Sequence, residues 1–306
     1  MSGDRVVVIG DALIDELRDP HGVREFIGGA ALNVAVGLSV LGVPTTLIAM
    51  VGDDEPGNRI RELLDAYRVE LLATPSPLGT ARAISERGPS GEPVYAFSDA
   101  ARQRRIRYGE AERAAIGAAP VTVVSCVAFD DETQTNELTD AVGGTPTRLV
   151  IDPNPRAGMM HDRERFIAGF EALVPSAALV KIGDDDARLL YRASLAEMRD
   201  RMLQLGAAAV LSTAGAEGAR VDGAGFSAAR GISNLPGRIM DTMGAGDATL
   251  ATIVRALVSD GELDGAGWER ALGEAMDVAA ATCRAEGALL RVPHQNEGDE
   301  AHRIDT

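Results

Sequence analysis

The sequence predicts an α/β protein with a mostly parallel central sheet that is covered by helices on both faces. Short apolar runs, typical of buried strands, alternate along the chain with stretches of helical character. The runs are Val6–Ile9, Thr46–Val51, Val121–Val124, Arg148–Ile151, Ala178–Lys181 and Ala208–Leu211, and the helical stretches include Gly57–Tyr67, Glu164–Leu173, Ser194–Leu205 and Val278–Ala288. Such alternation is typical of strand–helix–strand units.

Two segments interrupt this alternation. Thr80–Phe97 reads as a β-hairpin, with Ala81–Ser85 and Pro93–Phe97 as strands and Gly88-Pro89-Ser90-Gly91 as the turn. Leu13–Phe26 is irregular in its pattern. We therefore expect one large domain over residues 1–295, with these segments outside its sheet and a polar, frayed tail over residues 296–306.

Composition narrows the class of protein. The chain has 306 residues, of which 45% are hydrophobic and 25% charged, as in an ordinary globular protein. No apolar run approaches the length of a membrane span, and a net charge of −16 argues against nucleic acid or an anionic membrane as partner. Cys126 and Cys283 have no metal-like spacing, so we expect buried free thiols in a cytoplasmic protein.

Several common site motifs are missing from the chain. Lys181 is the only lysine and no G-x-x-x-x-G-K occurs, which excludes a Walker A loop. The absence of G-x-G-x-x-G weakens a dinucleotide-binding interpretation, and the absence of G-x-S-x-G weakens a hydrolase one. The four histidines are scattered without the spacing of a zinc site.

The most informative stretch is Asp241-Thr242-Met243-Gly244-Ala245-Gly246-Asp247, which precedes a run of small and apolar residues. Glycines allow close approach of the backbone to a ligand, and the first N–H groups of a helix bind anions. A carboxylate beside such an anion site is what transfer of a phosphoryl group to a hydroxyl requires. A plain Gly-rich turn with an Asp that begins a helix is the alternative.

A second motif lies near the N-terminus, where Gly28-Gly29-Ala30-Ala31-Leu32-Asn33 begins a run that extends to Gly42. The two motifs, in this order, resemble the signatures of the ribokinase-like (PfkB) family of carbohydrate kinases, in which the C-terminal one reads D-T-x-G-A-G-D. The resemblance covers the chain from Val6 to about Leu290. It implies a three-layer α/β/α fold, with a small β lid formed by residues of about 12–26 and 80–100.

The resemblance also implies roles for particular residues. Asp247 is expected to act as general base toward a sugar hydroxyl, while the backbone N–H groups of Gly244, Ala245 and Gly246 stabilise charge on the phosphate. The sugar is expected to contact Asp15, with Asp11 as a competing candidate, and a clamp formed by Gly28, Gly29 and Asn33.

Two further residues complete the expected sugar site. Asp152-Pro153-Asn154-Pro155-Arg156 resembles a segment of fructokinases and 2-keto-3-deoxygluconate kinases, in which Arg156 supplies positive charge to a phosphate or a substrate oxygen. Phe97, in the predicted hairpin, is a candidate contact from the lid. An ordinary exposed arginine and a surface hairpin are the alternatives.

The nucleotide site is expected around two strand ends. Ser212-Thr213-Ala214-Gly215-Ala216-Glu217-Gly218 matches the family's T-x-G-x-x-G loop, so Thr213, Gly215 and Gly218 are nucleotide contacts, joined by Lys181. The family's N-x-x-E motif, which orders magnesium-bound water, is altered here, since Gly183 replaces Asn and Asp186 replaces Glu. We expect ATP and Mg²⁺, with Asp186 acting through water and Asp241 as a second metal candidate, and an optional monovalent cation such as K⁺.

We expect a fructokinase, with fructose as the acceptor. A 2-keto-3-deoxygluconate kinase and a ribokinase are the alternatives. The first alternative would use Arg156, or the cluster from Arg102 to Arg107, to pair with a substrate carboxylate. A catalytically silent sugar or nucleotide sensor is an alternative of another class, against which the intact Asp247 motif argues. A homodimer formed through the lid is a further expectation.

Overall fold

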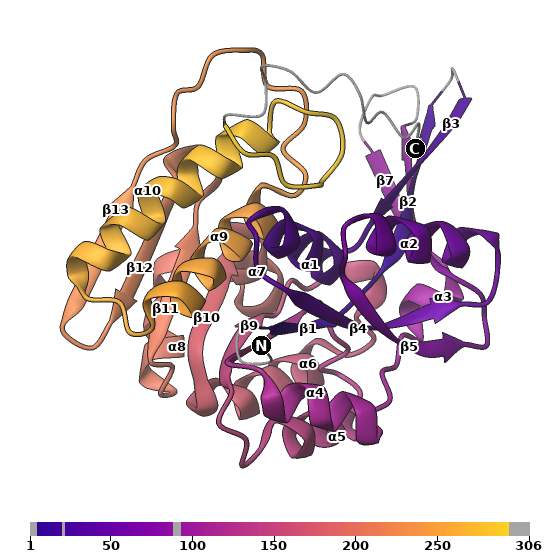
Figure 1. Ribbon diagram of the computed structural model, residues 1–306, viewed down its shortest axis with the longest axis horizontal. Helices are drawn as coiled ribbons and strands as arrows, with labels where there is room; N and C mark the ends of the chain where they lie inside the picture. Colours follow the sequence, from indigo (N-terminus) through magenta and orange to yellow (C-terminus); the bar gives the residue numbers. More distant parts are fainter. Residues whose placement is uncertain (1–4, 20–21, 88–92, 294–306) are drawn as a thin grey trace.

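A nine-stranded sheet runs through the centre of the computed structural model, which describes residues 5–19, 22–87 and 93–293 (Figure 1). Seven strands are parallel, and an antiparallel pair closes one edge. Their order across the sheet is β13 (Phe226–Arg230), β12 (Ala219–Gly223), β11 (Ala209–Thr213), β10 (Ala177–Gly183), β9 (Arg148–Asp152), β8 (Val121–Ser125), β1 (Val6–Gly10), β4 (Thr45–Gly52) and β5 (Glu70–Ser76).

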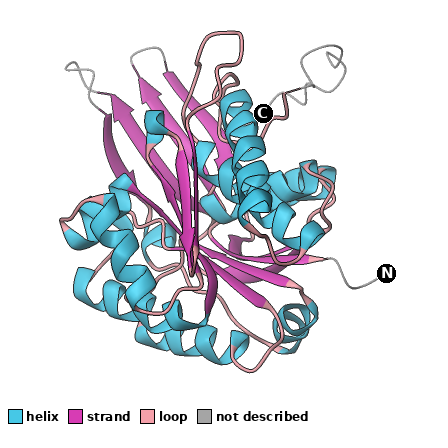
Figure 2. Ribbon diagram, turned by 90° about the vertical axis from the view of Figure 1, so that its left-hand side faces the viewer, coloured by secondary structure: helices cyan, strands magenta, loops and turns pink. Residues whose placement is uncertain are grey.

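Helices cover both faces of this sheet (Figure 2). Strand β1 shows why, because Val6 and Val8 pack into one core while Val7 and Ile9 pack into the other, as the alternation of side chains in a strand requires. The first core includes residues of α1 (Ala30–Val40), α2 (Glu55–Ala66), α9 (Ala245–Asp260) and α10 (Gly265–Thr282), and the second those of α4 (Glu110–Ala118), α5 (Glu132–Val142), α6 (Arg163–Leu173) and α8 (Leu195–Gln204). The predicted three-layer α/β fold is confirmed.

A second, four-stranded sheet projects from one end of the large sheet (Figures 1 and 2). Its order is β3 (Gly22–Gly28), β2 (Leu13–Asp19), β6 (Ala81–Arg87) and β7 (Pro93–Phe97). The predicted hairpin is present, since β6 and β7 pair antiparallel with Ala83 opposite Phe97, although its turn at Gly88–Gly91 lies outside the described residues. Leu13–Phe26 also breaks the alternation of strands and helices, as predicted, because it contributes to β2 and β3 of this small sheet, which pair in regular antiparallel register.

Short helices connect these elements. They are α3 (Asp99–Arg102), α7 (Asp184–Asp186), the 3₁₀ turns Ala157–Met159, Val174–Ser176 and Gly215–Glu217, and a π-helical turn Ala187–Tyr191. The predicted helix Val278–Ala288 was misplaced, because α10 starts at Gly265 and ends at Thr282, where Thr282 Oγ1 accepts a hydrogen bond from the N–H of Arg291. The strands β5, β12 and β13 were not predicted. Among the described residues, no helix is long and apolar enough to cross a membrane.

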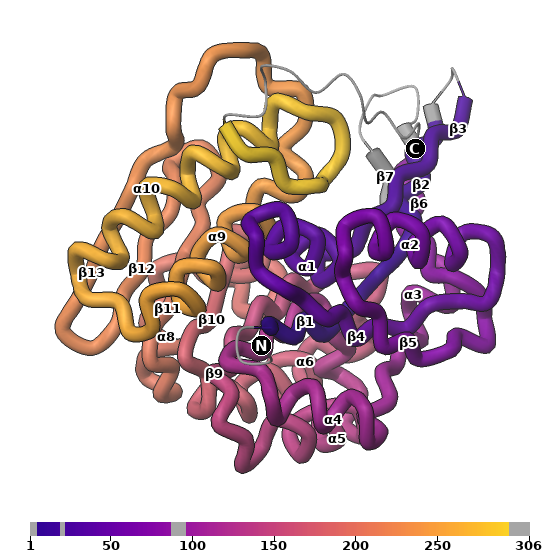
Figure 3. Tube along the Cα trace, viewed as in Figure 1, coloured from indigo at the N-terminus to yellow at the C-terminus, as the bar shows by residue number. Residues whose placement is uncertain are grey.

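The fold brings the N-terminal and the C-terminal motif together. Figure 3 shows α1, from the N-terminal part, beside α9, from the C-terminal part, and buried residues of both helices belong to one core. Gly37 of α1 permits this approach, because a Cβ there would lie 3.1 Å from the Cβ of Ala251. The glycine-rich motif that begins α1 and the motif that begins α9 therefore start adjacent helices.

Candidate active site

The turn before α9 depends on glycine. Gly244 precedes the helix with φ +75°, and a Cβ there would lie 2.0 Å from the backbone oxygen of Ala288, so no other residue fits without a shift of the backbone. The helix then starts at Ala245, and its first turn leaves the N–H groups of Gly246 and Asp247 without acceptors inside the helix. The backbone geometry at this place is that of the helix start for which the sequence predicts anion binding.

Asp247 lies in the first turn of α9 and is buried. Its Oδ2 accepts a hydrogen bond of 2.9 Å from Nδ2 of Asn33, in α1, which lies 214 positions away in the sequence. Burial raises the pKa of Asp247 to about 6, although attraction to Lys181 and the bond from Asn33 oppose the shift. The carboxylate therefore remains ionised at neutral pH while it retains the basicity that a general base needs.

Asn33 contributes a second polar atom to the same place. Its Oδ1 is buried and has no hydrogen-bond partner within the described part of the chain. A buried acceptor without a donor is costly and unusual in a folded protein. The atom is therefore a candidate to accept a hydrogen bond from a ligand hydroxyl.

Two acids of the first strand connection surround the start of α1. Asp11 Oδ1 accepts a hydrogen bond of 3.1 Å from the N–H of Ala31, and a Cβ on Gly29 would lie 2.7 Å from the backbone oxygen of Asp11. Asp15, in β2, lies against the next glycine, since a Cβ on Gly28 would come within 2.2 Å of Asp15 Oδ2. Glycine at position 28 leaves room for the carboxylate of Asp15, and glycine at position 29 leaves room for the backbone at Asp11.

A buried ion pair lies at the ends of β9 and β10. Lys181 Nζ lies 3.3 Å from Oδ1 of Asp152, and both side chains are buried. Burial opposes the charge of Lys181, but attraction to Asp152, Asp186 and Asp247 outweighs it and raises the lysine pKa. A Cβ on Gly246 would lie 3.4 Å from Nζ, so the ammonium group lies beside the start of α9 and adds positive charge there.

In the altered N-x-x-E segment, the last acid folds back onto the backbone of the first residue. Asp186 Oδ2 accepts a hydrogen bond of 2.7 Å from the N–H of Gly183, and burial raises the pKa of Asp186 against the attraction of Lys181. Gly183 is not needed by the fold, because its φ is −125° and an added Cβ would meet nothing closer than 3.5 Å. Its missing side chain is therefore a feature of the site rather than a requirement of the backbone.

The predicted nucleotide loop follows β11. Thr213 Oγ1 donates a hydrogen bond of 3.3 Å to the backbone oxygen of Ile182, which ties the loop to β10. Gly215 and Gly218 have φ of +47° and +96°, and a Cβ on Gly218 would lie 2.1 Å from the backbone oxygen of Arg230. A hollow of about 520 Å³ adjoins this loop and is lined in part by Ser212, Glu217 and Gly218.

The remaining metal candidate, Asp241, is half-buried in the loop before α9, and its Oδ1 accepts a hydrogen bond of 3.0 Å from the N–H of Met243. In the described residues, no group of three or more His, Cys, Asp and Glu has an arrangement that would hold a metal ion by itself. A metal at this site would therefore need ligands other than clustered side chains, such as phosphate oxygens and water.

Arg156 and Phe97 lie beside the small sheet. Arg156 is exposed, yet it is within electrostatic reach of Asp11, Asp186 and Asp247. Phe97, at the end of β7, is half-buried against Gly158, where a Cβ would lie 2.5 Å from the ring. The lid candidate thus packs on the 3₁₀ turn that follows Arg156.

Arg104 joins several loops in the same region. Its guanidinium donates hydrogen bonds of 3.1 to 3.3 Å to the backbone oxygens of Ala101, Cys126, Val127 and Met159. Four carbonyl acceptors occupy most of its five N–H donors. Arg104 therefore holds the loops together and has little capacity left for a substrate.

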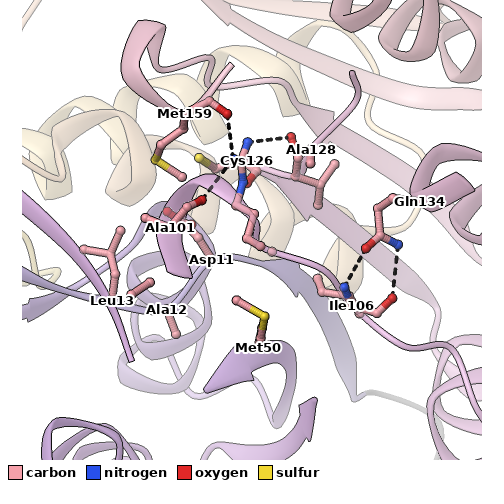
Figure 4. Close-up of a pocket in the computed structure, with 14 residues that line it drawn as sticks. Asp11, Ala12, Leu13, Met50, Ala101, Ile106, Cys126, Ala128, Gln134 and Met159 are labelled. Carbon is pink, nitrogen blue, oxygen red and sulfur yellow. Dashed lines mark hydrogen bonds between the residues drawn. The ribbon is translucent and has the colours of Figure 1, made fainter. Parts of the chain in front are cut away.

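A cavity of about 20 Å³ lies beside Arg104 and below the small sheet (Figure 4). Asp11, Leu13, Met50, Cys126 and Met159 border it, and only Asp11 among these side chains is charged. The space is sufficient for one water molecule and much too small for a sugar. Cys126 is buried, as predicted, whereas Cys283 is only half-buried, and both thiols are free.

The structure therefore gathers the predicted residues of the two motifs around one location, where Asp247, Asn33 and Lys181 contact one another directly or lie side by side. Sequence reasoning missed Asp152, although the residue stood in a quoted motif, and it missed the bond between Asn33 and Asp247. The one signal for Asp152 in the sequence was an acid at the end of an apolar strand.

Known proteins place this arrangement in a family. Residues 4–295 match the description "pfkB family carbohydrate kinase". The chain is 27% identical to a fructokinase of Rhizobium leguminosarum bv. trifolii over 276 residues, which is 83% of this chain and 80% of the relative. It is 28% identical to an acarbose 7(IV)-phosphotransferase of Actinoplanes sp. over 221 residues, which is 71% of this chain and 68% of the relative.

Solved structures show the same fold. A fructokinase with bound ATP from Xylella fastidiosa superposes with a TM-score of 0.77 at 20% identity, and the match covers 94% of each chain. An aminoimidazole riboside kinase from Salmonella enterica gives 0.76 at 21% identity, over 94% of this chain and 95% of the other. Since the family match spans nearly the whole chain, the protein belongs to the pfkB family of carbohydrate kinases and is an ATP-dependent phosphotransferase.

Proposed function

We propose that this kinase transfers the γ-phosphoryl group of ATP to a hydroxyl of a small neutral carbohydrate, with fructose as the first candidate. One observation carries the proposal: the buried Asp247 lies beside the N–H groups that begin α9 and is hydrogen-bonded to Asn33. A carboxylate in that position can remove the proton of the attacking hydroxyl while the helix start stabilises the charge on the transferred phosphate.

On this proposal, the acceptor lies between the starts of α1 and α9. Asp15 and Asn33 Oδ1 would accept hydrogen bonds from its hydroxyls, while Gly28 and Gly29 let the backbone approach it closely. Phe97 would cover the sugar from the small sheet, which then acts as the lid and excludes water from the transfer. Strand β3, at one edge of that sheet, is also the candidate surface for a homodimer, and its Val23 is exposed.

The nucleotide would lie along the ends of β10 and β11. Thr213, Gly215 and Gly218 provide the loop, and Lys181 and the start of α9 provide the positive charge that a polyphosphate requires. The residues present fit Mg²⁺ held through water and phosphate, with Asp186 and Asp241 as the ordering carboxylates. The ion would supply charge neutralisation of the phosphates. K⁺ is the candidate for an additional monovalent site.

The arginines of the lid region support a neutral acceptor over an acidic one. Arg102 binds Asp99 and the backbone oxygen of Phe97, Arg104 binds four carbonyls, and Arg105 pairs with Glu137. These contacts occupy three of the side chains that would otherwise meet the carboxylate of 2-keto-3-deoxygluconate. Curated relatives named fructokinase, at 24 to 27% identity, point in the same direction.

A coupled assay of ADP release tests the proposal. Fructose, ribose, tagatose, adenosine and 2-keto-3-deoxygluconate are offered at equal concentration with ATP and Mg²⁺, and we expect the highest kcat/KM with fructose. Preference for 2-keto-3-deoxygluconate would overturn the neutral acceptor. No ADP release with any acceptor, from protein that binds ATP, would instead favour a sensor.

A further inference from the structure

A connecting segment, residues 231–244, joins the two places proposed for the nucleotide. It begins beside the predicted nucleotide loop, because a Cβ on Gly218 would lie 2.1 Å from the backbone oxygen of Arg230 and 2.7 Å from Cα of Gly231. It ends at Gly244, which directly precedes α9. A ligand that contacts both the loop and the start of α9 therefore depends on the course of this segment between them.

Hydrophobic packing contributes little to the position of the connecting segment. All of its residues belong to the described part of the chain, and none of them lies in a helix or strand. Its large apolar side chains Ile232, Ile239 and Met240 are 56%, 57% and 47% exposed, so they do not hold it in a core. Such a segment keeps one position only where hydrogen bonds fix its backbone.

Arg284 supplies hydrogen bonds of this kind from the end of α10, which the segment passes between β13 and α9 (Figure 1). Its Nε donates a hydrogen bond of 2.7 Å to the backbone oxygen of Pro236, and its Nη2 donates one to the backbone oxygen of Leu235. Its Nη1 donates a bond of 2.7 Å to the backbone oxygen of Ala280, in the last turn of α10. Carbonyls of a last helical turn have no partner inside the helix and carry partial negative charge, so they hold the guanidinium in place while it binds the segment.

The end of α10 also fixes the point at which the segment enters the C-terminal motif. The N–H groups of Met240 and Asp241 donate hydrogen bonds of 2.8 and 3.3 Å to the backbone oxygen of Cys283, the residue before the arginine. A further bond, from Ser233 Oγ to Asp277, lies at the surface. The backbone that leads into the Asp241 motif is therefore held from the same place as the middle of the segment.

We propose that Arg284 is a positioning residue for the nucleotide. By holding the connecting segment to the end of α10, it sets the place of the predicted nucleotide loop relative to the start of α9. Arginine suits this role because its planar group presents several donors at once, here to three carbonyl oxygens. The inference rests on the nucleotide placement of the proposed function, and it adds a residue that acts on the nucleotide through the backbone alone.

The variant Arg284→Met tests the role in nucleotide binding. Calorimetry with ATP and Mg²⁺, without an acceptor, should show binding weakened by about tenfold, and kcat/KM for ATP with fructose as acceptor should fall by about 10- to 100-fold, because small displacements of binding groups are costly. The KM for fructose should stay within about twofold of the native value, since the acceptor contacts are not moved. Arg270→Met, at an exposed position of α10, is the matched control for the loss of one positive charge and should bind ATP as the native protein does.

Hydrogen exchange of the free protein tests the anchoring itself. In Arg284→Met, the amides of Met240 and Asp241 should exchange about tenfold faster or more, because the segment loses its charged hydrogen bonds to the end of α10. The amides of the large sheet should exchange as in the native protein. Thermal unfolding verifies that each variant is folded.

Arg284→Lys is the second variant and serves where Arg284→Met fails to fold. It keeps the charge and the aliphatic stem, but a single nitrogen cannot reach three carbonyls as the planar group does, so ATP binding should still weaken several-fold. Native ATP affinity in either folded variant, including one whose segment exchanges faster, would overturn the inference and leave Arg284 as a cap of α10. Because ATP binding is measured without an acceptor, failure of fructose as a substrate would remove the proposed acceptor and leave this test unaffected.

Discussion

Asp152, at the end of β9, and Asp15, in β2 of the small sheet, are both carboxylates of one candidate site, yet their surroundings differ. Asp152 is fully buried and lies 3.3 Å from the ammonium of Lys181. Asp15 is half-buried, has no paired cation among the described residues, and has a pKa raised to about 7. Asp152 is therefore paired without a ligand, on the side proposed for phosphate, whereas Asp15, on the side proposed for the acceptor, is not.

On the proposed function, the difference follows from the ligand that each side receives. A polyphosphate brings several negative charges, so the side that receives it needs fixed positive groups, here Lys181 and the start of α9. A sugar brings hydroxyl donors, so its side needs free acceptors, and an acid already paired with a cation would offer fewer of them. The comparison predicts that removing a charge has opposite effects on folding stability at the Lys181–Asp152 pair and at Asp15.

Lys181→Met should remove the ion pair with Asp152 and destabilise the protein. It leaves Asp152 as an unpaired buried carboxylate, for which the cost in folding stability is about 3–5 kcal/mol. Chemical denaturation measures the loss. The double variant Lys181→Met with Asp152→Asn should recover much of it, since both charges are then gone. A single variant as stable as the native protein would show that the pair contributes nothing, and that the two acids do not differ as described.

Asp247→Asn tests the proposed general base. It should keep the fold and ATP binding, because an amide can still meet Asn33, but it should lower kcat by about 100-fold or more through loss of the base. In the native protein, kcat should fall as the pH drops below about 6, where Asp247 becomes protonated. Steady-state ADP release, with ATP affinity measured separately, checks both statements. Turnover near that of the native protein would remove Asp247 as the base.

Sequence reasoning found the glycines and acids of both motifs because local chemistry dictates them. Gly244 and Gly218 stand where a Cβ would strike a backbone oxygen, and the Asp247 motif begins a helix, so each leaves a mark in the sequence itself. The antiparallel strands β12 and β13 left little mark, since they are short and rich in Gly, Ala and Arg. They also follow one another without a helix between them, so the expected alternation of strands with helices did not predict them.

The contacts that sequence reasoning missed are those that only tertiary packing creates. Asn33 was assigned to the sugar from its motif, but the packing of α1 on α9 turns its amide nitrogen to Asp247 and leaves only its oxygen unpaired. Likewise, Lys181 meets Asp152 because β9 and β10 are neighbours in the sheet, and no spacing along the chain reports that adjacency.

Asp15→Asn should stabilise the free protein, in contrast to any change that leaves Asp152 unpaired. The pKa of Asp15 is raised on folding, so its contribution to stability is fully present below its unfolded pKa of about 4 and is lost as the pH rises through about 7. Removing the charge should therefore raise stability at pH 8 by about 1 kcal/mol, a value reduced for the partial exposure of the side chain, and by much less near pH 5. Thermal unfolding at the two pH values measures the difference.

The same variant should raise the KM for the sugar by about tenfold and leave the KM for ATP unchanged, because a hydrogen bond to a charged group is lost on the acceptor side alone. Asp15→Asn that destabilises the protein at pH 8 would mean that Asp15 is already neutralised by the fold, and the two acids would then differ only in exposure.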